Sequence, residues 1–312
     1  MDVKRPQILL FGNGLLQSFG GESWNKFLIS IKKRDDLPHP DKINCPEPLK
    51  AILLTNDQID KAMKEKCQEL LGKNNMTVDL AEIIRELFLI GFDHILTTNY
   101  TYELEQAAIY PKILTESKVK QIAKCTTGNV EKKYLLHTYN EVVCGGLPNK
   151  IWHIHGEARK PDSTILGHYY YGNSLYKIKD EAGKRADYER STEARSWVEA
   201  FLFADIYCLG FGFGLAEFDL WWLLNRKARE KNNSGKLYFY EPLDKSQWEK
   251  IELLNLMKST TGEKLVKIEN LGYTRGDSMP WSEFYRDAII DIKSKIHKGV
   301  LIENAEKELL LV

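Results

Sequence analysis

The sequence predicts an α/β fold in which a Rossmann-like, doubly wound and mostly parallel sheet carries helical insertions. Short apolar runs bounded by turn residues alternate with segments of helical periodicity. Short runs without polar alternation are typical of strands that are buried on both faces. Strands that alternate with helices indicate parallel pairing through helical crossovers. We therefore expect one domain over residues 1–312.

The apolar runs define the expected strands, in chain order Ile8–Phe11, His94–Thr97, Ile151–Ile154, Asp205–Leu209, Leu237–Tyr240 and Leu265–Ile268. Helical spacing of apolar residues predicts helices over Val78–Ile90, Phe218–Lys227, Trp248–Met257 and Trp281–Ile296. The first two strands lie far apart, and Leu37–Pro48 between them contains four prolines. We expect a helical insertion over about residues 25–90, a further insertion over about 106–150, and C-terminal helices over about 281–312.

Charge and cysteine content limit the function classes. The chain has 44 Lys and Arg against 44 Asp and Glu, and this zero balance disfavours direct nucleic-acid binding, which needs a cationic surplus. The five cysteines include no CxxC pair, which excludes a four-cysteine zinc ribbon and a thioredoxin-like motif. We expect no metal. No apolar run is long enough for a signal peptide or a membrane span, which predicts a cytoplasmic protein without membrane contact.

A glycine turn follows the first predicted strand, in Ile8-Leu-Leu-Phe-Gly-Asn-Gly14. Glycine allows the backbone to turn tightly and to approach a pyrophosphate, whose charge free N–H groups can bind. Gln17 stands where a full dinucleotide-binding motif has its third glycine. A tight turn without a ligand is therefore an equal alternative for Gly12, Asn13 and Gly14.

The second predicted strand ends in Thr97-Thr-Asn-Tyr100, at the edge where open α/β sheets bind ligands. Thr97 and Asn99 are candidate ligand contacts. Alternatively, Thr98 or Asn99 only caps the following helix.

The third strand, Ile151-Trp-His-Ile-His-Gly156, directs His153 and His155 to the same face. Three interpretations remain open: a metal pair, which lacks a further ligand at suitable spacing; two structural histidines; or His155 as a general base near working pH.

A second glycine crossover occurs in Ile206-Tyr-Cys-Leu-Gly-Phe-Gly-Phe-Gly214, and two such crossovers on one sheet favour a dinucleotide. Glu241 ends the next strand, where it would face an adenosine ribose or would simply end the strand.

In this order, the motifs resemble those of the sirtuin superfamily, and more closely those of bacterial sirtuin-like NAD hydrolases of anti-phage defence. The resemblance spans roughly residues 7–270 and is carried by Gly12-Asn-Gly14 with Ser23-Trp24, Thr97-Thr-Asn-Tyr100, Ile151-Trp-His-Ile-His-Gly156, Ile165-Leu-Gly-His168 and Glu217-Phe-Asp-Leu-Trp-Trp222. It departs from the family at Thr101, where an Asp is usual, and in lacking the zinc cysteines of protein deacylase sirtuins.

The resemblance implies that Asn99 and His155 are catalytic and that NAD is the substrate. It also implies that Gly12, Asn13 and Gly14 line the diphosphate and that Gly210 and Gly212 lie nearer the adenosine. The expected activity is hydrolysis of the nicotinamide–ribose bond by an abortive-infection effector. An NAD-dependent protein deacylase and a non-catalytic NAD or ADP-ribose sensor are the alternatives. Because such an activity must be controlled, we expect a separately encoded partner protein, a homo-oligomer, or both.

Overall fold

The predicted strands come together as one central sheet, which confirms the Rossmann-like α/β class. The computed structural model describes residues 5–72, 76–112, 122–128, 131, 133–184, 194–230, 235–276 and 278–309. Within this part of the chain, eight strands form a sheet in the order β3-β4-β5-β2-β1-β6-β7-β8. Neighbouring strands from β5 to β8 pair in parallel, and β3 and β4 are added by antiparallel pairing.

The parallel strands match the predicted runs to within a few residues. Their bounds are β1 Gln7–Phe11, β2 His94–Thr97, β5 Leu147–His153, β6 Asp205–Leu209, β7 Leu237–Tyr240 and β8 Val266–Glu269. β5 begins earlier than the predicted strand because its first half pairs only with β4 Thr138–Cys144.

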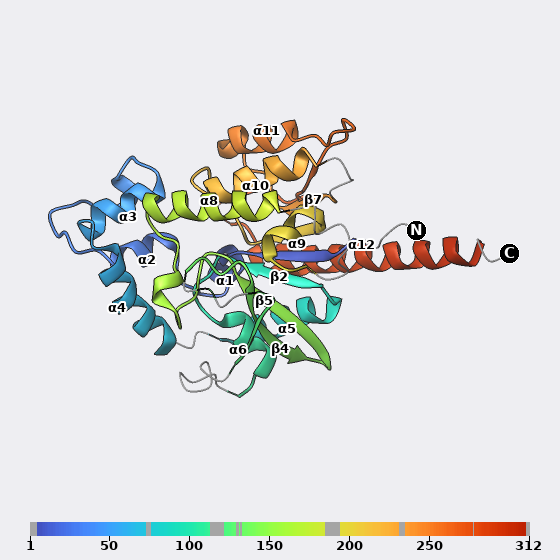
Figure 1. Ribbon diagram of the computed structural model, residues 1–312, viewed down its shortest axis with the longest axis horizontal. Coiled ribbons are helices and arrows are strands. Elements are labelled where there is room, and N and C mark those ends of the chain that lie inside the picture. Colours follow the sequence, from blue (N-terminus) through green and yellow to red (C-terminus); the bar gives the residue numbers. More distant parts are fainter. Residues whose placement is uncertain are drawn as a thin grey trace.

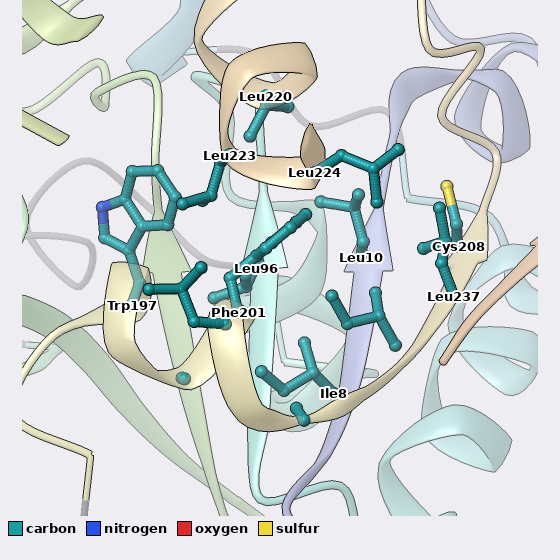
Figure 2. Packing of buried hydrophobic residues seen from close by; sticks show 14 of the residues in the cluster. Ile8, Leu10, Leu96, Trp197, Phe201, Cys208, Leu220, Leu223, Leu224 and Leu237 are labelled. Carbon is teal, nitrogen blue, oxygen red and sulfur yellow. The ribbon is translucent and has the colours of Figure 1, made fainter. Parts of the chain in front are cut away.

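One face of the sheet is covered by four helices, namely α8 His168–Gly183, α9 Trp197–Phe203, α10 Phe218–Ala228 and α11 Trp248–Leu256. Ile8 and Leu10 of β1 point into this layer, since alternate residues of a strand share a face. Figure 2 shows them packed with Phe201 of α9 and Leu223 of α10, all without exposed surface. This cluster therefore fixes α10, whose first turn carries site residues, onto the sheet.

The opposite face is covered by α1 Asn13–Ser18, α5 Val78–Ile90, α6 Glu103–Ile109 and α12 Trp281–Leu309. Leu9 and Phe11 of β1 point into this layer. Thr77 caps the start of α5, where its hydroxyl accepts the Leu80 N–H. Gly91 caps the end of α5 in the left-handed conformation. The sheet thus lies between two helical layers, as Figure 1 shows.

The expected helical insertion contains two different parts. α2 Trp24–Ser30, the short 3-10 helix η1 Pro40–Lys42, α3 Glu47–Thr55 and α4 Ile59–Gly72 surround a core of their own. These helices lie at the left of Figure 1, beside the sheet. α5, by contrast, packs directly on the sheet. We call α2, η1, α3 and α4 the helical module, because one wall of the candidate site comes from it.

The expected further insertion over about 106–150 adds strands to the sheet. β3 Ala123–Thr126 pairs with β4, and β4 turns into β5 through Gly145 and Gly146, which both have positive φ. Residues 113–121, 129, 130 and 132 of this segment lie outside the described residues, as do residues 310–312 of the expected C-terminal helices. In the described part of the chain, no helix has the length and apolar character needed to cross a membrane.

Candidate active site

The candidate site lies where the connections of the sheet change direction. β1 is followed in space by β2 on one side and by β6 on the other, so their carboxyl ends form a topological switch point. A cavity of about 640 Å³ opens there, within the usual size range of small-molecule sites. Of the predicted site residues, its lining contains Asn13, Gly14, Asn99, His155, Gly210, Gly212 and Glu241. Gly12 and Thr97 are not part of the lining.

The two glycine crossovers contact each other beneath the cavity. A Cβ atom on Gly12 would lie 2.4 Å from the Cα of Phe211, and one on Gly14 would lie 2.7 Å from the Gly210 carbonyl oxygen. The N–H of Gly12 donates to the Leu209 carbonyl and that of Gly14 to the Gly210 carbonyl, at 3.0 and 2.7 Å. These two amides are therefore engaged within the fold, and the glycines are required by close packing of the crossovers.

Gly212 and Asn13 have different surroundings. A Cβ on Gly212 would meet nothing within 4 Å, so packing does not require a glycine at this position of the lining. The Asn13 amide donates to the Glu22 carbonyl at 2.8 Å and thereby ties the first crossover to the segment before the helical module.

Asn99 is held through its backbone. Its N–H donates to the Thr97 hydroxyl at 3.1 Å, which is the structural role of Thr97. Its carbonyl lies 2.8 Å from His153 Nδ1. The Asn99 side-chain amide makes no hydrogen bond to any residue that the structure describes, and it lines the cavity. The amide is thus fixed in place and available to a ligand, and it does not cap α6.

The two histidines of the third predicted strand have separate roles. His153 Nδ1 contacts the Asn99 carbonyl, and its Nε2 lies 3.0 Å from the Glu105 carboxylate. Burial alone would lower the pKa of His153, but Glu105 outweighs this effect and raises it. Both nitrogens are used inside the protein, so His153 is a structural residue that positions Asn99.

His155 lines the cavity, with only 3% of its surface exposed. Its Nε2 lies 3.1 Å from Asp219 Oδ2, and its Nδ1 lies 3.8 Å from Glu217 Oε2. Burial alone would lower the pKa of His155, but these two carboxylates together raise it above its ordinary value. Burial also raises the pKa of Glu217, despite the opposing effect of His155. A titratable group with acidic partners at a cavity wall is suited to accept a proton.

His155, Glu217 and Asp219 also offer three donor atoms that lie within 4.8 Å of one another. The His155 nitrogen nearest to Asp219 is Nε2, whereas the one nearest to Glu217 is Nδ1. One metal ion binds only one nitrogen of an imidazole, so this arrangement suits a hydrogen bond between Nε2 and Asp219, with the Glu217 carboxyl near Nδ1, better than coordination of a single ion.

The other walls come from segments that the sequence did not indicate as parts of one site. Trp24 and Phe27 of the helical module line the cavity with their rings stacked, 5.0 Å between centroids. Arg275 also lines the cavity. It lies 3.5 Å from Glu241, and its guanidinium lies 5.5 Å from the Trp281 ring of α12. Arg275 is the one Lys or Arg in the described lining.

The lining carries an excess of carboxyl groups. They belong to Glu22, Glu47, Glu103, Glu217 and Glu241. Four of these have basic or hydrogen-bonding partners, whereas Glu103 Oε2 is buried without a partner among the described residues. Burial raises the pKa of Glu103, opposed by a hydrogen bond with Thr101. Thr101 stands where the sirtuin-like pattern usually has an Asp. It lies with Glu103 and Asn99 in the cavity wall.

Asp219, Glu217 and Arg275 were not among the site residues predicted from the sequence. Asp219 and Glu217 stand directly after the second glycine crossover, and acids in the first turn of a helix at a sheet's carboxyl edge were a usable signal. Arg275 lies in an irregular segment after β8, and no sequence pattern indicated it as a site residue. Searches against protein-family models and against curated proteins find no match to this chain.

Proposed function

We propose that this protein hydrolyses NAD at the nicotinamide–ribose bond and releases nicotinamide and ADP-ribose. The observation that carries the proposal is that Asn99 and His155, from the ends of adjacent strands β2 and β5, line one cavity together with both glycine crossovers. The cavity lies at the edge where dinucleotides bind to open α/β sheets. The order of the motifs along the chain, which resembles sirtuin-like NAD hydrolases, supports the same activity.

The residues present suit the chemistry of this reaction. The bond between C1′ of the ribose and the nicotinamide nitrogen breaks, its electron pair goes to the ring nitrogen, and nicotinamide leaves as a neutral molecule. The remaining ribose passes through an oxocarbenium-like state, as in glycoside hydrolysis generally. The carboxyl groups of the lining favour such positive charge.

Asn99 and His155 have complementary tasks. The Asn99 amide is both donor and acceptor, so it can hold the attacking water and a ribose hydroxyl. The water oxygen bonds to C1′, and its proton goes to His155, which acts as a general base. A general base contributes roughly 10²–10⁴-fold to such a rate.

The test measures nicotinamide release from NAD by the purified full chain in its activated assembly. We expect Asn99→Ala and His155→Ala each to reduce turnover by about 100-fold or more, with unchanged circular dichroism. His39→Ala is the matched control, because His39 is exposed and outside the cavity lining. Near-native turnover in either site variant would overturn the assignment of roles.

Two further measurements separate the alternatives. Nicotinamide release that depends on an acetyl-lysine peptide would indicate a protein deacylase. Calorimetric binding of NAD without any product would indicate a sensor. Release without a peptide supports the hydrolase.

We also propose a role as an abortive-infection effector, because depletion of cellular NAD stops the host metabolism on which a phage depends.

A further inference from the structure

Asp219 lies behind His155, on the side away from the cavity. It has no exposed surface and does not belong to the cavity lining. Its Oδ2 accepts a hydrogen bond from the Ser174 hydroxyl of α8 at 3.3 Å, in addition to its contact with His155 Nε2 at 3.1 Å. Its Oδ1 accepts the N–H of Leu220 at 2.9 Å. The carboxylate is therefore held in one orientation by two helices.

The other nitrogen of His155 faces the cavity side. Nδ1 is the atom nearest to Glu217, and Glu217 lines the cavity. The ring of Tyr171 contacts the imidazole edge-on, with 5.5 Å between centroids, and prevents it from rotating freely. A carboxylate can only accept a hydrogen bond, so the contact with Asp219 requires a hydrogen on Nε2. In the neutral imidazole, the lone pair is then on Nδ1.

We propose that Asp219 is a positioning residue that holds His155 in the Nε2–H tautomer, so that Nδ1 is the nitrogen that takes the proton from the attacking water. The inference rests on the proposed function, since it names the atom that acts in that reaction. Asp219 touches neither substrate nor water, and it acts only through His155. An Asp that orients a catalytic imidazole in this way is known to matter strongly for hydrolytic rate elsewhere.

The charged groups around His155 define the expected pH dependence. Asp219 and Glu217 from the start of α10 favour the imidazolium, whereas the buried phenols of Tyr171 and Tyr100 remain neutral, since burial raises the pKa of each. A general base must be deprotonated, so turnover rises with pH through the pKa of His155. Removal of the Asp219 charge lowers that pKa and moves the rise in turnover to lower pH.

The first experiment compares Asp219→Asn with the wild-type chain. We expect kcat to fall by about 100-fold or more while KM for NAD changes less than about threefold, because an amide can also stabilise the wrong tautomer. The rise of kcat with pH should move to lower pH. Asp180→Asn is the matched control, an exposed acid on α8 that pairs with Lys184. A native kcat and pH profile in Asp219→Asn would overturn the positioning role and leave the proposed function intact.

The second experiment does not depend on activity. Nuclear magnetic resonance of ¹⁵N-histidine-labelled wild-type chain reports which ring nitrogen carries the hydrogen, and His155→Gln identifies the signal among the seven histidines. Above the pKa of His155, we expect hydrogen on Nε2 and a bare Nδ1. Hydrogen on Nδ1 with a bare Nε2 would overturn the inference. If the wild-type chain releases no nicotinamide even in its activated assembly, the proposed function fails, and the tautomer is still decided by this measurement.

Discussion

Gly12 and Gly212 differ in what surrounds them. The difference predicts that alanine destabilises the fold at Gly12 and leaves its stability nearly unchanged at Gly212. In Gly12→Ala, the new methyl group would collide with the backbone of Phe211, which cannot move without separating β1 from β6. We expect a loss of about 3 kcal/mol in the free energy of unfolding, at the upper end of the cost of overpacking. Gly212→Ala, with open space around its Cβ, should stay within about 0.5 kcal/mol of wild type. Urea denaturation of both variants measures this, and equal stabilities would contradict the packing account.

The proximity of Asn99 and His155, the proposed catalytic pair, was predictable from sequence, whereas the contacts that hold them were not. Asn99 and His155 each follow an apolar run, and the carboxyl ends of parallel strands meet at one edge. The residues that hold them in place come from distant segments: His153 reaches the Asn99 carbonyl, and Asp219 is 64 positions away from His155. Such contacts depend on how helices pack on the sheet. The sequence indicates acids at the start of α10, but it does not indicate which histidine they contact. Gly12 was predicted to line the diphosphate. Its N–H donates instead to the Leu209 carbonyl within the fold.

Strands β2 and β5 are joined by a buried side-chain contact that makes the sheet sensitive to acid. Trp152 of β5 donates its indole N–H to His94 Nδ1 of β2 at 3.2 Å, so His94 must be neutral there. Burial, with a smaller effect of Lys150, lowers the pKa of His94 to about 4. The unfolded chain binds a proton to this residue below about pH 6.5. The contribution of His94 to stability is therefore lost as the pH falls from about 6.5 towards 4, and it amounts to about 3 kcal/mol at most.

This prediction is tested on His94→Gln by measuring the free energy of unfolding between pH 4 and 6.5, where the variant should show a shallower pH dependence than wild type. His137→Gln is the control with the opposite sign, and it is measured between pH 6.5 and 9. The Glu181 carboxylate, 3.6 Å from His137 Nε2, raises the pKa of His137 to about 9, so the contribution of His137 to stability is fully present below about pH 6.5 and is lost as the pH rises from there towards 9. Identical slopes in wild type and His94→Gln would contradict the role of His94.

At the level of elements, the parallel strands were predictable because each is a continuous apolar run, whereas β4 was missed for a physical reason. Its residues alternate between buried and partly exposed, since it lies near the edge of the sheet. Gly145-Gly146 between two such segments is a strong hairpin signal, and it would have indicated the β4–β5 turn. The core of the helical module was not predictable from the module's own residues, because it includes Tyr100 and Leu166 from outside the module.

For the whole molecule, control of activity is the open functional question. Unrestrained hydrolysis of NAD would deplete the cell, so we propose that a separately encoded partner, self-association, or both restrain the activity. We expect little NAD consumption by the isolated monomer and a large increase in the activated assembly. Copurification from the native host, followed by light scattering and an NAD-consumption assay with and without the partner, measures this. A monomer that is fully active alone would contradict the proposal.

The lining of the cavity extends along the chain from Asn13 to Tyr285, and no single segment contains most of it. A nascent chain therefore lacks part of the wall until Trp281 and Tyr285 of α12 have been synthesised and have packed against the sheet. For the NAD hydrolase that we propose, this order of assembly would protect the producing cell during translation. Fragments released by premature termination before α12 would carry Asn99 and His155 and still lack a complete site.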